Sequence, residues 1–326
     1  MAILVGIDEA GYGPHLGPLV VAAGAIAFTG DAVPEPDLWG ALRSHVRKRP
    51  SGTSSCVVVC DSKVAYSGGS IATLERAVLG FLAAMDLKPS SLAELLAATA
   101  VLCEADGAGG TAPRPWDSPQ GLALPAATDG EAVGSAAEHL TQGFARLGAS
   151  AAGLWVNVAS PPRFNHLVQT TRNKAAALFA LTADLLTEVR TRWPRQTVHV
   201  TMDRHGSRRY YAGLLAAAFP MTAVETLEET PAVSRYRLGR NGSAAPVHLT
   251  ICNRCETWSL VTALASMAAK YVRELHMRQL NGYFQSLVPG LAPTAGYGRD
   301  AWRFLDDVAA AREAAGVPEA AVLRCR

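Results

Sequence analysis

The sequence contains no uninterrupted apolar run that approaches the roughly 20 residues of a membrane-spanning helix. The longest candidate is the short stretch from Leu19 to Phe28. The first residues also lack the basic region of a secretory signal peptide, and they reach Asp8 and Glu9 before an apolar stretch of signal length is complete. We therefore expect a cytoplasmic protein that has no membrane partner.

An excess of charge of one sign is also missing. The 326 residues include 30 basic and 28 acidic side chains, which gives a net charge of +2, and only 18% of residues are charged while 49% are hydrophobic. This balance excludes a disordered chain and a histone-like protein whose whole surface binds phosphate. We expect a monomer that buries its own core and contacts any nucleic acid through local basic patches.

The charge that is present is unevenly distributed. Residues 104 to 138 contain six acids and one base, a net charge of −5, so the remainder of the chain carries +7. Residues 104 to 130 are rich in Gly, Pro, Ala and Ser and show little apolar periodicity, which predicts a flexible insertion at about residues 104–135. We expect residues 1–326 to form one domain with this insertion and with a helical C-terminal part from about residue 257.

Cysteines are few and have no framework spacing. Cys252-Asn-Arg-Cys255 is a single CxxC, and a structural zinc site needs four ligands. Reduced thiols are therefore expected. The six cysteines are Cys56, Cys60, Cys103, Cys252, Cys255 and Cys325.

Hydrophobic patterning predicts strands that alternate with helices. Two strands joined by a turn rich in Gly and Pro are expected first, one ending at residue 7 and one covering residues 19–28. This order favours an α/β domain with a mixed central sheet flanked by helices. The other expected strands cover residues 56–60, 153–158, 197–202, 222–227, 234–238 and 247–252, and the expected helices cover residues 71–85, 164–192, 207–219 and 256–284.

Acidic residues fall at the ends of several predicted strands. Asp8 and Glu9 end the first strand, Asp203 ends a later one, and Glu256 stands where a strand gives way to a helix. A single acid of this kind is most often a turn former or a helix cap. Four that gather at one sheet edge would repel one another unless cations neutralise them, and carboxylates suit Mg²⁺ or Mn²⁺. The pattern indicates a two-metal phosphoryl-transfer site.

Five groups of residues around these acids follow one another in a recognisable order. They are Asp8-Glu-Ala-Gly-Tyr-Gly-Pro-His-Leu-Gly-Pro18; Asp61-Ser-Lys63; Val198 to Asp203; Arg254-Cys-Glu256 with Ser266 to Lys270 and Arg273-Glu274; and Gly296-Tyr-Gly298. Together they resemble the motifs of the type 2 ribonucleases H, the ribonuclease HII-like family, of which this chain would be a divergent member.

The resemblance implies an RNase H-like fold with a C-terminal helical extension. It also implies a site in which Asp8, Glu9, Asp203 and Glu256 are both catalytic residues and ligands of two Mg²⁺ or Mn²⁺ ions. One ion would activate a water and the other would stabilise the departing 3′-oxygen. Such an endonuclease cuts the RNA strand of RNA/DNA hybrids, or duplex DNA at an embedded ribonucleotide, and leaves 5′-phosphate and 3′-hydroxyl ends.

The resemblance further implies contacts with nucleic acid. Gly11 and Gly13 would let backbone amides approach the 2′-hydroxyl that distinguishes RNA from DNA. Lys63 would bind a phosphate, and Tyr297 would stack on the sugar beside the ribonucleotide. Tyr12 could stack on the nucleic acid, and Arg254 and Lys270 are weaker candidates for the same surface.

Departures from the family pattern keep two alternatives open. Tyr12 stands in place of an arginine that would grip phosphate, and Glu256 in place of an aspartate, so a weakened or inactive hybrid-binding relative is one alternative. Arg299 replaces a threonine, and Trp302 stands near a histidine position. The second alternative is an actin-like ATPase or sugar kinase, because Gly6-Ile-Asp-x-x-Gly11 also resembles the first phosphate loop of that class. Neither a second Asp-x-Gly loop nor a Gly-Gly adenosine site stands at a suitable position.

Overall fold

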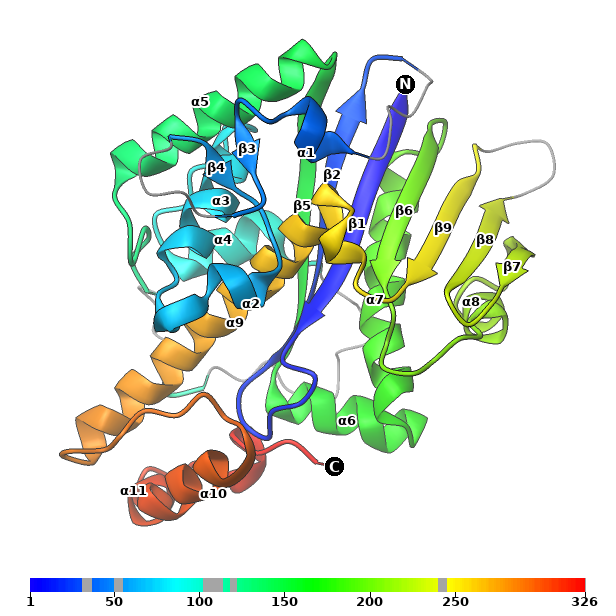
Figure 1. Ribbon diagram of the computed structural model, residues 1–326. Helices are drawn as coiled ribbons and strands as arrows, with labels where there is room; N and C mark the ends of the chain where they lie inside the picture. Colours follow the sequence, from blue (N-terminus) through cyan, green and yellow to red (C-terminus); the bar gives the residue numbers. More distant parts are fainter. Residues whose placement is uncertain (31–36, 50–54, 102–113, 118–121, 240–244, 326) are drawn as a thin grey trace.

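A mixed seven-stranded sheet forms the centre of the molecule in the computed structural model, which describes residues 1–30, 37–49, 55–101, 114–117, 122–239 and 245–325 (Figure 1). The strand order is β5-β2-β1-β6-β9-β8-β7. Strands β1, β6 and β9 run parallel to one another, and the other neighbours are antiparallel. The strands are β1 (Ala2–Ala10), β2 (Leu19–Phe28), β5 (Ala149–Ala159), β6 (Thr197–Asp203), β7 (Ala223–Glu229), β8 (Val233–Gly239) and β9 (Val247–Cys252).

Helices flank this sheet, as the sequence predicts (Figure 1). One group packs on one face: α3 (Ala72–Ala83), α4 (Leu92–Thr99), α5 (Gly130–Arg146) and α9 (Leu260–Leu287). A second group packs on the opposite face: α6 (Pro161–Thr171), α7 (Lys174–Arg192) and α8 (Ala212–Ala218). The remaining elements are α1 (Leu38–Ala41), α2 (Ser62–Ala65), the short strands β3 (Val46–Arg47) and β4 (Val57–Val58), α10 (Gly298–Asp307) and α11 (Ala309–Ala314).

The central strands are apolar because both of their faces are buried. In β2, Val20 and Ala22 belong to the core with α3, α5 and α9, while Leu19 and Val21 belong to the core with α6, α7 and α8. Helix α9 lies so close to β1 that a Cβ on Gly6 would come within 2.1 Å of the Thr262 backbone nitrogen. This close approach brings the first turns of α9 against the strand that carries Asp8 and Glu9.

Several predicted elements differ from the structure. The helix expected over residues 164–192 is interrupted between α6 and α7, where Arg172 adopts a left-handed conformation and Asn173 caps α7. The helix expected from residue 207 begins only at Ala212. The strand expected over residues 56–60 contributes only β4, which pairs with β3 outside the central sheet. The first two differences fall on short polar runs, residues 169–174 and 207–209, which the predicted helices included.

The insertion predicted at about residues 104–135 lies partly outside the described residues. Where the structure describes it, the segment makes contacts with the rest of the fold. Trp116 is buried against Tyr283 and Phe284 of α9. The backbone of residues 126–128 is bound by Glu75, and α5 begins at residue 130.

The C-terminal part is helical, as expected, and has its own small core, in which Phe304 of α10 packs against Phe284 of α9. Among the described residues, no helix combines the length and the apolarity needed to cross a membrane.

Candidate active site

The three parallel strands bring the four predicted acids to one edge of the sheet. Asp8 and Glu9 lie in the last third of β1, and Asp203 is the last residue of β6. The register pairs Ile7 with Met202, so Asp8 and Asp203 occupy neighbouring positions on adjacent strands. Glu256 follows β9 in the short 3-10 turn Cys255–Thr257 and does not open a long helix, because α9 starts at residue 260. Strands that run in the same direction end at the same edge, and this is why residues nearly 250 positions apart meet here.

Hydrogen bonds from the backbone fix two of these carboxylates. The Glu9 amide donates to Asp8 Oδ1 at 2.8 Å, and the Cys255 amide donates to Asp203 Oδ1 at 3.0 Å. Asp8 is buried beneath α9 and interacts with the Ser266 hydroxyl. The second bond joins β6 to the turn that carries Glu256. The two hydrogen bonds therefore fix the positions of Asp8 on β1 and Asp203 on β6.

The four acids act on one another through their charges. Burial raises the pKa of Asp8 well above its usual range, and the charges of Glu9 and Asp203 raise it further. Burial, followed by the charge of Asp203 and then that of Glu256, raises the pKa of Glu9 to about 8. The pKa values of Asp203 and Glu256 are raised as well, chiefly by burial. Mutual repulsion of this kind is typical of a site that a cation completes.

The donor set fits a divalent cation in its chemistry. Glu256 Oε2 is buried and has no hydrogen-bond partner in the described part of the chain, so this oxygen lacks the compensation that a buried carboxylate requires. Carboxylate oxygens are the ligands that Mg²⁺ and Mn²⁺ prefer. Within the residues described, however, no three acidic, histidine or cysteine side chains stand close enough together to hold one ion as they are. The carboxylates are therefore gathered without forming a finished coordination shell.

The turn between β1 and β2 lies beside the acids and contacts the segment that contains Tyr297. Gly11 has a φ of +89°, and a Cβ there would come within 2.6 Å of Arg273 Nε, so both conformation and space require glycine. A Cβ on Gly13 would meet only the Tyr297 ring, at 3.8 Å. Tyr297 is 47% exposed, and its ring lies 5.5 Å from the Arg273 guanidinium. The structure thus brings Gly11, Gly13 and Tyr297 together on one surface.

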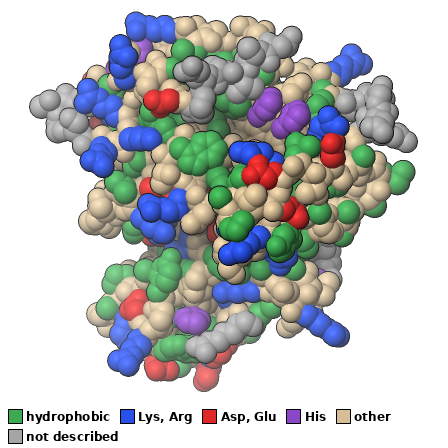
Figure 2. Space-filling model, turned by 45° about the vertical axis from the view of Figure 1, so that its right-hand side comes forward, with side chains coloured by type: hydrophobic (Ala, Val, Ile, Leu, Met, Phe, Trp, Pro, Cys, Tyr) green, Lys and Arg blue, Asp and Glu red, His purple; other side chains and the backbone are tan. Residues whose placement is uncertain are grey.

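Two predicted basic residues also face the acids. Lys63 is exposed in α2, just after the cap Asp61, and its charge opposes the rise in the pKa of Glu9. Arg254 is exposed at the start of the turn that carries Glu256, and its charge likewise opposes the rise in the Glu256 pKa. Lys and Arg side chains are spread over the face shown in Figure 2, and several of them border the hollow between the main body and the smaller lower part.

The expectation of reduced thiols is wrong for one pair of cysteines. Cys252 and Cys255 form a disulfide that closes the turn between β9 and Glu256. The sequence shows the CxxC but not its oxidation, because this depends on how the turn folds. Cys60 and Cys325 are free thiols.

Sequence reasoning missed a basic pocket next to the acids. A cavity of about 550 Å³ is lined by Tyr12, by Asn173 and Ala175 at the start of α7, and by residues 205–210, which include Arg208 and Arg209. Two adjacent arginines soon after Asp203, in a chain with few charges, were the available signal.

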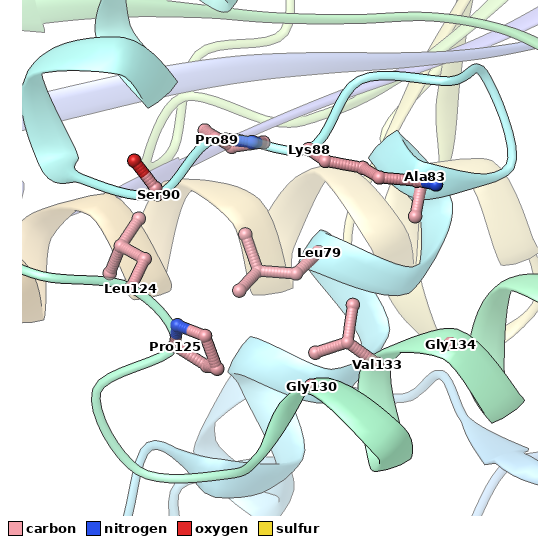
Figure 3. A pocket seen from close by; sticks show the side chains of 10 residues that line it. All are labelled: Leu79, Ala83, Lys88, Pro89, Ser90, Leu124, Pro125, Gly130, Val133 and Gly134. Atoms are coloured by element: carbon pink, nitrogen blue, oxygen red, sulfur yellow. The ribbon is translucent and has the colours of Figure 1, made fainter.

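A second cavity, of about 310 Å³, lies between α3 and α5, and the described residues that line it include no acid and no histidine (Figure 3). It is therefore no candidate for acid or metal chemistry.

Comparisons with known proteins give matches in structure only. No protein-family model and no curated protein matches the chain. The chain is similar to RNase HII and RNase HIII structures. The RNase HII of a PCNA:RNase HII complex from Archaeoglobus fulgidus matches with 14% identity and a TM-score of 0.42, over 99% of this chain and 94% of that one. The ribonuclease H2 from Pyrococcus horikoshii OT3 matches with 13% identity and a TM-score of 0.43, over 98% and 92%. Bst-RNase HIII in complex with Mn²⁺ matches with 16% identity and a TM-score of 0.39, over 94% and 62%. The interpretation of the site depends on its own geometry and not on these distant matches.

Proposed function

We propose that this protein is a metal-dependent endoribonuclease that cleaves the RNA strand of RNA/DNA hybrids, including ribonucleotides embedded in duplex DNA. The observation that carries the proposal is the convergence of Asp8, Glu9, Asp203 and Glu256 from three parallel strands, with mutual repulsion in a buried setting. Two bound Mg²⁺ or Mn²⁺ ions would supply an activated water and stabilise the charge on the leaving 3′-oxygen.

The residues of the chain supply position and recognition. Backbone amides hold the carboxylates of Asp8 and Asp203 in fixed orientations, which reduces the reorganisation needed at the moment of reaction. Gly11 leaves the turn open for close approach to a ribose 2′-hydroxyl, and the half-exposed ring of Tyr297 offers a stacking surface beside it. Lys63 adds a positive charge where the phosphate backbone would lie.

A cleavage assay with the full chain tests this function. The substrates are an RNA/DNA hybrid, duplex DNA with one ribonucleotide and duplex DNA without one, each in Mg²⁺ and in Mn²⁺. Asp8→Asn and Asp203→Asn each keep the shape of the side chain but remove its charge, and each is expected to reduce cleavage at least about 100-fold. Asp306→Asn, at an exposed position on α10, is the matched control and should cleave like the wild type.

The outcomes separate the possible functions. Normal cleavage by Asp8→Asn or Asp203→Asn would remove that acid from the site. Hybrid binding without cleavage in either metal would favour the inactive hybrid-binding relative. Circular dichroism of each variant shows whether a lost activity reflects chemistry or unfolding.

A further inference from the structure

The loop that follows Asp203 carries none of the four acids described above and is itself basic. It joins β6 to α8 and carries Arg204, Arg208 and Arg209 within six residues. Two of these arginines line the cavity of about 550 Å³, whose described lining includes no acid. The cavity adjoins the acid cluster through Tyr12, because the pKa of Tyr12, raised chiefly by burial, responds both to the charge of Glu9 and to that of Arg208.

The opposite wall of this cavity is the start of α7. Asn173 caps this 19-residue helix by accepting hydrogen bonds from the amides of Ala175 and Ala176. The first helical residue, Lys174, holds its Nζ 4.9 Å from the centre of the Tyr12 ring. The positive end of a helix dipole and two arginines therefore border one cavity, with Lys174 against the Tyr12 ring that lines it, and this arrangement favours an anion.

Buried polar atoms without partners point to a ligand at the same place. His205 is only 2% exposed and lines the cavity, and its Nδ1 has no hydrogen-bond partner in the part of the chain that the structure describes. The other ring nitrogen lies 3.3 Å from the Thr182 hydroxyl. Arg208 Nε is likewise buried without a partner among the described residues. Buried polar groups are nearly always satisfied, so these two atoms indicate an absent hydrogen-bonding group.

The loop is held rigidly enough to serve as a preformed site. The Tyr211 hydroxyl accepts a hydrogen bond from the His205 amide at 3.0 Å, and the Ser234 hydroxyl donates to the Arg209 carbonyl at 2.5 Å. The Arg204 guanidinium donates to two carbonyls just before β8 and so turns away from solvent. Arg208 and Arg209 therefore project from a backbone that is anchored to β8, which lowers the entropy lost when they bind an anion.

We propose that this cavity binds a backbone phosphate of the nucleic-acid substrate, at a position separate from the phosphate that is cleaved. The proposal rests on the proposed function, since it assigns a second contact with the same substrate. A guanidinium can bind two phosphate oxygens at once, which a lysine cannot, so Arg208 and Arg209 beside the start of α7 suit a phosphate group. The subsite would also extend the contact with the substrate backbone beyond Tyr12. At that position the ribonucleases that the sequence resembles have an arginine.

Hybrid binding as a function of salt tests the subsite. The hybrid is bound in Ca²⁺, or by the Asp203→Asn variant, to prevent cleavage. Arg208→Gln and Arg209→Gln should each weaken binding about tenfold or more and reduce the slope of log K against log salt by about one. Arg209 is exposed, so its replacement leaves the fold intact. Arg195→Gln, exposed near the start of β6, makes the same charge change and should have less than a twofold effect.

A second measurement separates this proposal from the proposed function. Inorganic phosphate is titrated into the ¹⁵N-labelled protein while the Arg Nε–H resonances are recorded, with the Arg208 signal assigned by its loss in Arg208→Gln. Phosphate should shift this signal even if the protein cleaves no substrate. Cleavage of the hybrid with an unshifted Arg208 signal would overturn the subsite but not the enzyme. If Arg208→Gln and Arg209→Gln bind the hybrid with the same slope of log K against log salt as Arg195→Gln, the cavity does not bind a substrate phosphate.

Discussion

Replacement of Glu75 tests how the chain anchors the segment that the sequence marks as an insertion. Glu75 lies in α3, and its side chain is completely buried. One carboxylate oxygen accepts hydrogen bonds from the Ala126 amide at 2.7 Å and the Tyr271 hydroxyl at 2.8 Å. The other accepts from the amides of Ala127 and Thr128, both at 2.7 Å. A single side chain thus joins α3, α9 and the segment before α5.

The structure sets the size of the effect of Glu75→Gln. Glutamine has the same shape, but whichever way its amide is oriented, an NH₂ group replaces one oxygen and faces two donors. Each buried donor that is left without an acceptor costs about 1–3 kcal/mol, so the variant should lose about 2–6 kcal/mol in its free energy of unfolding. Tyr271→Phe removes one donor and leaves the carboxylate with three, so it should lose only about 1–2 kcal/mol.

Urea unfolding at 25 °C measures these losses, and amide hydrogen exchange reports on the segment itself. In Glu75→Gln the amides of residues 126–128 should exchange faster than in the wild type, because they lose their acceptor. Glu138→Gln, at an exposed position on α5, is the matched control. The reasoning is refuted if Glu75→Gln lies within about 0.5 kcal/mol of Glu138→Gln, the range expected for a surface change, and if exchange at residues 126–128 is unaltered.

Two further predictions concern α9. Burial, with a smaller contribution from a nearby arginine charge, lowers the pKa of His276 to about 4. The pKa of an unfolded histidine is about 6.5, so the protein should lose up to about 3 kcal/mol of stability as the pH falls from 6.5 to 4. Thermal melts at pH 7.5 and 5 should show a smaller loss in His276→Leu than in the wild type or in the exposed control His166→Leu; equal losses would contradict this. Gly6→Ala places a Cβ 2.1 Å from the Thr262 nitrogen and should lower stability by several kcal/mol, whereas Gly213→Ala, where nothing lies within 4 Å of the new Cβ, should not. Similar melting temperatures for these two variants would contradict the close packing of α9 on β1.

The sheet and the place of the acids could be predicted from the sequence because both depend on local patterns. The apolar stretches that form β1, β2, β6 and β9 are recognisable without any tertiary information. Asp8, Glu9 and Asp203 stand at the ends of two of them, and Glu256 stands in the turn that follows β9. Strands that are parallel must end at a common edge, so the approximate meeting of Asp8 and Asp203 follows from topology alone. The single domain, the monomeric state and the cytoplasmic location stay predictions.

Details that depend on a single backbone angle could not be predicted. The break between α6 and α7 results from a φ of +51° at Arg172, a residue type that usually continues a helix. Glu256 reaches the site because Arg254, with a φ of +59°, starts a tight turn before α9. Glu256 is therefore presented from a turn that the disulfide closes, and sequence spacing alone predicts neither the turn nor the bond.

The basic pocket was missed because its walls come from segments that are distant in the sequence. Lys174 owes its position to the break before α7, and Arg208 owes its position to a loop that was expected to be a helix. Had residues 164–192 and 207–219 been continuous helices, the same side chains would have been distributed around helical faces rather than around one cavity. The two errors in secondary structure and the missed pocket therefore have one cause. In a chain with few charges, a helix that is interrupted at a basic residue is therefore a place to examine for substrate contacts. This holds most clearly when the interruption lies beside strand ends that carry acids.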